Sequence, residues 1–401
     1  MKLAPNVLKF NIKRARWFGV LCWSFFWSMS VSSQNQFSAL FNHGENGGFT
    51  SIIECKEGYL ATGGRVEGNT QRAAIWRLND MGQVIDSLFF GEGDTQYESR
   101  KDVLVELPDQ HFATAFAVYD GSYAIRLIKF SDQLSIIQEQ WVTSQFFDEA
   151  EPSTNFIDFG ELVTSHEGEI YLAIGLYTPE FGNFLGINKY SMDFDLQWNY
   201  VKHDHIANGV LCAHATNSGI VFTDKGTDAP VSQRNILKLS PEGEELWGFV
   251  IDPPLPYGSY APRRIKFQDG NVVIAAGGRN QEWEIEKSAP LLYAMDTTGT
   301  LLWTSLPVES PMSSTFMDVL DTTCDGGFVG ACQWDNGQLQ NDTLVASDQR
   351  ITMLLRYDEN GEILWTRKFM IVDKPMAEHD INEVISLSDG GMMMAGSVMG
   401  S

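Results

Sequence analysis

One short phrase recurs along most of the chain, and this repeat limits the available folds more than any other feature. Each copy has an apolar run, a turn rich in Gly, Asp or Asn, and a second run that leads into small residues. Copies are spaced 51 to 64 residues apart, with markers at Gly58, Gln110, Gly168, Gly219, Gly270, Gly327 and Gly391. Seven units of this length are typical of a closed repeat architecture.

A second phrase falls between successive copies and contains a basic residue, a polar turn and often a Trp, as in ILKLSPEGEELW at residues 236–247. Both phrases predict β-hairpins, because short runs of apolar, β-branched and aromatic residues flank turn residues. Two hairpins per unit make a four-stranded sheet. We therefore predict an all-β fold, a seven-bladed β-propeller of four-stranded antiparallel blades.

The ends of the chain suggest how such a ring closes. The seventh copy has one hairpin, and only four residues follow Ser397. The segment Phe37–Asn42 resembles a fourth strand that precedes the first copy. We expect this N-terminal strand to join the last hairpin and remove exposed edges. The last blade is then incomplete with three strands, or the natural chain continues past residue 401.

Four tryptophans occupy one equivalent position on the predicted fourth strands, Trp198, Trp247, Trp303 and Trp365. Blades diverge toward the outside of a propeller, so large side chains are needed to fill the gaps between sheets. We interpret these indoles as structural packing residues. Ligand stacking is the alternative.

The N-terminus has the pattern of a secretory signal peptide. Residues 1–16 hold five Lys or Arg and no acid, and an apolar run of 13 residues follows from Trp17 to Met29. That run is too short to span a membrane as a helix. We predict a signal peptide at 1–33, a single propeller domain at 34–401 with no transmembrane segment, and a secreted or cell-surface location; an uncleaved anchor is the alternative.

Charge and cysteines bound the partners further. The chain carries 28 basic and 52 acidic residues, and the mature part carries 23 and 52, a net charge of −29. Nucleic acid binding needs clustered Lys and Arg, so this class of partner is excluded. The spacing of Cys55, Cys212, Cys324 and Cys332 predicts free thiols and no zinc site. We expect a monomer.

Several repeat phrases resemble a known group of proteins. DGGFVGAC (325–332), DGGMMMAG (389–396), DENGEILW (358–365) and TTGTLLW (297–303) are similar to repeats of secreted bacterial β-propellers with PQQ-like or WD-like repeats. More closely, they resemble repeat regions of proteins exported by type IX secretion. The resemblance covers roughly residues 37–400. It implies a scaffold, and such exported proteins usually end in a sorting domain; residues 34–401 show none, which leaves open either another export route or a natural chain that continues past residue 401.

The predicted ligand-binding residues lie in loops that would share one face of the propeller, where function is commonly carried. Aromatic residues beside Asp, Asn and Arg suit an extracellular glycan or a peptide. The alternative is that these are solvent-exposed loop residues without a binding role. The residues are Tyr177 and Phe181 in blade 3, Arg279, Trp283 and Glu284 in blade 5, and Trp334, Asp335 and Asn336 in blade 6.

No cofactor is predicted, but two segments are candidate metal sites. Asp335-Asn336-Gly337 resembles part of an oxygen-rich loop that suits calcium. His203-Asp204-His205 would place two imidazoles on one face of an extended segment, although a third ligand is not identifiable. A polar connecting loop is the alternative. With so many acids, the sequence selects no catalytic carboxylate pair.

These observations favour an extracellular or cell-surface binding scaffold without enzymatic activity. The first alternative is an enzyme on the same scaffold, either a PQQ-type dehydrogenase or a polysaccharide lyase or hydrolase. The second is a component of an outer-membrane assembly. The fold cannot decide among them.

Overall fold

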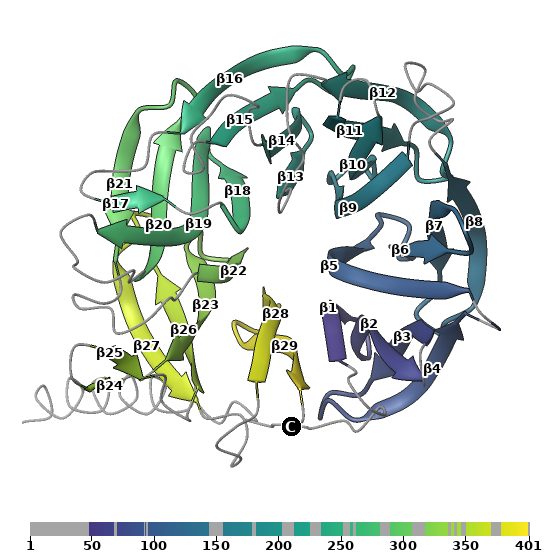
Figure 1. The fold of residues 1–401 in the computed structure, drawn as a ribbon, viewed down its shortest axis with the longest axis horizontal. Helices are drawn as coiled ribbons and strands as arrows, with labels where there is room; N and C mark the ends of the chain where they lie inside the picture. Colours follow the sequence, from purple (N-terminus) through teal and green to yellow (C-terminus); the bar gives the residue numbers. More distant parts are fainter. Residues whose placement is uncertain are drawn as a thin grey trace, which may run out of the picture. The chain divides into compact units, whose positions relative to one another are not determined.

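The structure is a computed structural model that describes residues 48–399, except 68–69, 92, 94, 144–154, 179–181, 203–211, 225–233, 252–256, 260–261, 281–288, 307–316, 336–337, 341–342, 346–349 and 370–377. These described residues belong to one compact unit, Leu40–Ser401. Every regular secondary-structure element among these described residues is a β-strand (Figure 1). The described part of the chain contains no helix that is long and apolar enough to cross a membrane.

The strands form six blades, numbered here in chain order, and each blade contains an antiparallel sheet of at least four strands. Blade 1 contains β1 (Gly48–Cys55), β2 (Gly58–Glu67), β3 (Thr70–Leu78) and β4 (Val84–Phe90). Blade 2 contains β5 (Gln96–Glu106), β6 (Phe112–Tyr119), β7 (Tyr123–Phe130) and β8 (Ile136–Val142). Blade 3 contains β9 (Asn155–Thr164), β10 (Ile170–Thr178), β11 (Gly182–Tyr190) and β12 (Leu196–Lys202).

The second half repeats this pattern with insertions. Blade 4 contains β13 (Ala213–Thr216), β14 (Gly219–Asp224), β15 (Arg234–Leu239) and β16 (Glu245–Ile251). Blade 5 contains β17 (Tyr257–Ser259) and β18 (Arg264–Gln268), which both pair with β19 (Asn271–Asn280), then β20 (Ala289–Asp296) and β21 (Leu301–Ser305). Blade 6 contains β22 (Met317–Thr322), β23 (Phe328–Asp335), β26 (Arg350–Tyr357) and β27 (Ile363–Phe369), with a small separate hairpin of β24 (Gln338–Gln340) and β25 (Thr343–Val345).

The prediction of seven blades is wrong, because the seventh repeat does not form a blade of its own. It forms the hairpin of β28 (Glu378–Ser386) and β29 (Met392–Met399), which extends the sheet of blade 1 to six strands. The junction is the pair Gly48 and Ser397. A Cβ on Gly48 would lie 2.3 Å from the Ser397 Cβ, so glycine permits this close approach. The predicted closing strand, Phe37–Asn42, lies outside the described residues.

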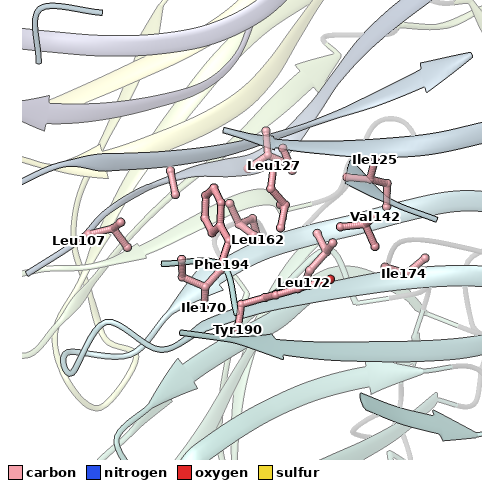
Figure 2. Packing of buried hydrophobic residues seen from close by; sticks show 13 residues of the cluster. Leu107, Ile125, Leu127, Val142, Leu162, Ile170, Leu172, Ile174, Tyr190 and Phe194 are labelled. Atoms are coloured by element: carbon pink, nitrogen blue, oxygen red, sulfur yellow. The ribbon is translucent and has the colours of Figure 1, made fainter. Parts of the chain in front are cut away.

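Hydrophobic clusters lie between neighbouring blades and hold them together. Figure 2 shows the cluster between blades 2 and 3, where Ile125 and Leu127 meet Leu162 and Leu172. All four side chains are at most 2% exposed. Because both faces of a blade pack in this way, the second strands are buried on both sides, as in β6 and β10. This explains the small residues that follow the first turn of each repeat.

The second hairpin of each blade closes with one turn chemistry. The first turn residue is Asn79, Ser131, Ser191, Ser240, Asp296 or Asp358 in blades 1 to 6. Its side-chain oxygen accepts hydrogen bonds from the backbone N–H groups two and four residues later, as Asp296 does from Thr298 and Thr300. Such side-chain to backbone bonds explain why Asn, Ser and Asp recur there.

The basic residue of the second phrase anchors the first turn of its own blade. Lys129 and Lys189 on third strands are each 4% exposed. Their Nζ atoms lie 2.9 Å from Asp109 Oδ2 and 2.5 Å from Glu169 Oε1. Arg356 pairs with the turn residue Asp325 in the same way. A buried ammonium or guanidinium needs such a partner, so the charge fixes the turn against its blade.

Candidate functional site

Charged side chains gather where the first strands of the blades meet. These strands follow one another from β1 through β5, β9, β13, β18 and β22 to β28, which returns to β1 (Figure 1). We call Asp102, Glu161, Arg264, Asn382 and Glu383 the central cluster. Its members come from β5, β9, β18 and β28.

β-Bulges place several of these residues. The pairing shifts at Gly160–Glu161 in β9 and at Asn382 in β28, where an extra residue interrupts the ladder. In β5 the shift spans residues 100–103, and Asp102 adopts φ of 50°. This left-handed conformation is uncommon for a residue other than Gly, Asn or Asp. A β-bulge changes the direction in which a side chain points, and bulges often lie near functional sites. Here the bulges orient the side chains of the central cluster toward one another.

Arg264 lies at the middle of the cluster and is 6% exposed. Its Nε lies 2.5 Å from Asp102 Oδ2 of blade 2, and its Nη1 lies 3.6 Å from Glu161 Oε1 of blade 3. It also donates to two backbone carbonyls, from Nη1 to Arg263 O at 2.6 Å and from Nη2 to Asn382 O at 3.2 Å. One guanidinium of blade 5 therefore connects blades that are not its sequence neighbours.

The acids of the first strands also accept backbone N–H groups from neighbouring first strands. Glu161 Oε2 accepts from Ala213 N at 2.6 Å, and Glu383 Oε2 accepts from Ile52 N. Asp321, beside the cluster, accepts from Ser386 N at 2.9 Å. These contacts join β9 to β13, β28 to β1 and β22 to β28. The same device thus recurs at three joints between first strands.

The crowding of buried acidic side chains raises the pKa values of two glutamates. Burial, followed by the repulsion of Asp102, raises the pKa of Glu161 well above its usual value. The same two causes raise the pKa of Glu383. Glu161 Oε2 accepts an N–H, whereas Oε1 has no hydrogen-bond partner among the described residues and is the oxygen available to a proton. Protonation of Glu161 would reduce the repulsion among Asp102, Glu161 and Glu383 around Arg264.

Chemically, the central cluster combines a carboxyl group whose pKa is raised with a carboxylate that pairs with a guanidinium. Glu161 is 4% exposed, and its Oε2 is engaged in a contact between blades. The side chain of Asp102 is 20% exposed and Arg264 holds it. The described atoms of this cluster therefore serve chiefly to bind blades to one another.

The predicted ligand-binding residues lie elsewhere, at the ends of second strands. Tyr177 lies in β10, Arg279 in β19, and Trp334 and Asp335 in β23. Phe181, Trp283, Glu284 and Asn336 lie outside the described residues, as do His203-Asp204-His205. In the described ranges, no group of three His, Cys, Asp or Glu side chains could hold a metal ion.

The ladder registers give these strand ends equivalent positions in their own blades. Lys189 on the third strand of blade 3 pairs with Tyr171, and Arg356 in blade 6 pairs with Val329 at the same position. Tyr177 lies six residues after Tyr171 in its strand, and Asp335 lies six residues after Val329. The same count reaches Tyr119 in blade 2 from Ala113 and Arg279 in blade 5 from Val273. We call this edge, formed by Tyr119, Tyr177, Arg279 and Asp335, the rim.

The four equivalent tryptophans are half-buried beside clusters between blades. Trp198, Trp247, Trp303 and Trp365 pack against the clusters at the 3–4, 4–5 and 5–6 contacts and between blade 6 and β28. Trp198 Nε1 donates to Pro241 O in the next blade at 2.8 Å. These contacts place each indole beside the element that follows its blade.

Sequence reasoning missed the central cluster. The acids lie in first strands among many other acids, and the bulges leave no pattern in residue type. The one available signal was Arg264 and Lys266, two cations in a predicted inner strand. A cation in such a crowded strand requires acidic partners from other blades.

Comparison with known proteins finds similar solved structures only at low sequence identity. No protein-family model and no curated protein matches the chain. A periplasmic gluconolactonase from Pseudomonas aeruginosa is 12% identical with a TM-score of 0.45, covering 80% of this chain and 85% of that one. The WD40 domain of SCAP from fission yeast is 10% identical with a TM-score of 0.38, covering 85% and 82%. A protein of unknown function from Dyadobacter fermentans is 10% identical with a TM-score of 0.45, covering 83% and 96%. Values this low carry no argument about activity.

Proposed function

We propose that the protein is a binding scaffold without enzymatic activity, which contacts an extracellular glycan, peptide or surface partner through its rim. One observation carries this proposal: the charged groups of the central cluster are bonded to strands of other blades. The single guanidinium of Arg264 contacts elements of blade 2, blade 3 and β28. Groups engaged in this way hold the sheets together, and the rim is left for recognition.

The rim suits this role for two further reasons. Its positions Tyr119, Tyr177, Arg279 and Asp335 are equivalent in the registers of their own blades, so several blades would contribute contacts from corresponding strand ends. By residue type these positions are two tyrosines, an arginine and an aspartate, types that suit ligands with both apolar faces and hydrogen-bonding groups.

Binding and turnover measured on one preparation test the proposal. Residues 34–401 would be screened on a glycan array and a peptide array, and assayed for polysaccharide cleavage and for dehydrogenase activity with PQQ and Ca²⁺. We expect saturable binding that Arg279→Ala weakens, no turnover, and unchanged binding by Glu161→Gln. Turnover that Asp102→Asn abolishes, in a protein that binds nothing on either array, would overturn the proposal in favour of an enzyme.

The extracellular location is part of the proposal and has its own test. Expressed with residues 1–33, the protein should leave the cytoplasm and begin near Gln34 when the exported form is analysed by mass spectrometry. Full retention of residues 1–33 in the cytoplasmic fraction would contradict it.

A further inference from the structure

The tip of the β6–β7 hairpin in blade 2 presents two tyrosines to solvent. Tyr119 is 40% exposed and Tyr123 is 53% exposed. The two residues are direct partners in the ladder, so their side chains leave the same face of the sheet. Their ring centroids lie 4.7 Å apart with an interplanar angle of 44°. Together they form one aromatic surface, which we call the tyrosine platform.

The platform stands on a rigid base. The ladder continues directly from it to Ile125, which is 2% exposed and packs in the cluster between blades 2 and 3 (Figure 2). At the tip, Asp120 Oδ1 accepts hydrogen bonds from Ser122 N and Ser122 Oγ at 3.4 and 3.2 Å. A Cβ on Gly121 would meet nothing within 4 Å, so the space around the turn is open. Little conformational entropy remains to be lost when a ligand binds.

The chemistry of the platform selects a class of ligand. Tyrosine offers large, rigid amphipathic contact area with few rotatable bonds. Residues 119–123 include one carboxylate and three hydroxyl groups but no cation. The chain as a whole has a net charge of −24. Polyanions are therefore disfavoured, whereas a neutral ligand with apolar C–H faces and many hydroxyls is matched.

We propose that the tyrosine platform binds a neutral pyranose ring of a glycan, which stacks on Tyr119 and Tyr123 while its hydroxyls bond to the polar groups of the tip. This inference rests on the proposed binding function and assigns its ligand class. Tyr119 belongs to the rim, so a glycan bound here can extend along the rim toward blade 3.

The test uses residues 34–401 and titration calorimetry with neutral hexose oligosaccharides. A polyuronate oligosaccharide and a proline-rich peptide serve as comparison ligands. We expect binding of the neutral oligosaccharides, a loss of at least tenfold in affinity for Tyr123→Ala, and near wild-type affinity for Tyr123→Phe, which keeps the ring. A tenfold loss corresponds to about 1.4 kcal/mol. The matched control is Trp141→Ala, which removes an aromatic side chain that is 45% exposed on β8 of the same blade.

Each outcome separates this inference from the function on which it rests. Equal affinity of wild type and the Tyr119→Ala/Tyr123→Ala double variant would overturn the platform, and if Arg279→Ala still weakens binding, the scaffold proposal stands. Binding of the peptide or the polyuronate in place of neutral sugars would overturn the ligand class alone. A wild-type protein that binds no glycan overturns the platform, and the array and turnover assays described above then decide the scaffold proposal. Thermal unfolding of every variant at the wild-type temperature confirms that the fold is intact.

Discussion

Replacing Arg264 by Met is the most direct test of the central cluster. Met keeps most of the aliphatic volume and removes the guanidinium. Asp102 then loses its partner at 2.5 Å, and the carbonyls of Arg263 and Asn382 lose their donors. Breaking a buried ion pair from one side typically costs about 3–5 kcal/mol, because the remaining charge stays buried and unpaired. We therefore expect a loss of about 4 kcal/mol in the free energy of unfolding.

Urea unfolding followed by Trp fluorescence measures this loss, with circular dichroism as a second probe of the same transition. Arg367→Met is the matched control, because Arg367 is exposed on the outer strand β27 and should change stability by less than about 1 kcal/mol. The double variant Arg264→Met/Asp102→Asn should be more stable than Arg264→Met, since it removes the stranded charge. A loss below about 1 kcal/mol for Arg264→Met would refute the view that these charges hold the blades together.

Three further outcomes follow from particular side chains. Because burial and the repulsion of Asp102 raise the pKa of folded Glu161 above the unfolded value of about 4.5, the stability that its proton contributes is complete below the unfolded pKa and is lost as pH rises through the folded pKa; urea unfolding from pH 5 to 8 should show wild type losing stability relative to Glu161→Gln, and parallel curves would contradict this. Gly361→Ala should destabilise by about 1–3 kcal/mol in thermal unfolding, because φ is 78° and the new Cβ would lie 2.5 Å from the ring of Trp303; an unchanged midpoint would show that this contact is loose. A thiol reagent should label the exposed Cys324 quickly and spare Cys212, whose pKa burial raises to about 12, as peptide mass mapping would show; equal labelling would disprove the buried position.

Local features of the fold could be predicted with confidence from the chain because they depend on neighbours in sequence. The hairpins follow from alternating apolar runs and turn residues such as Asp296 with Gly299, which adopts φ of 82°. The propeller class follows from repeating those hairpins at one spacing. The number of blades does not follow, since the pair Gly48 and Ser397 joins residues from opposite ends of the described chain.

The sequence selected three of the four rim residues, and their role in ligand binding stays a prediction. Tyr177, Arg279 and Asp335 were selected from composition beside turns, and the ladders place all three at equivalent positions in their own blades. The tyrosine platform was overlooked, although Tyr119 and Tyr123 flank a short turn that makes them cross-strand neighbours. Exposure is what distinguishes them from the many buried aromatics, and exposure depends on packing between blades.

The amino-acid sequence by itself determined strands, turns, the propeller class and the strongly acidic character, because each depends on residue type and short spacing. Tertiary structure alone decided that the chain forms six blades, that the last hairpin extends the first sheet, and that Arg264 meets Asp102 and Glu161. The physical reason is that hydrogen-bond pairing and charge compensation act between groups brought together in space. Bulges in separate strands aim those groups at one another, and no local pattern records where a strand on the far side of the molecule will end.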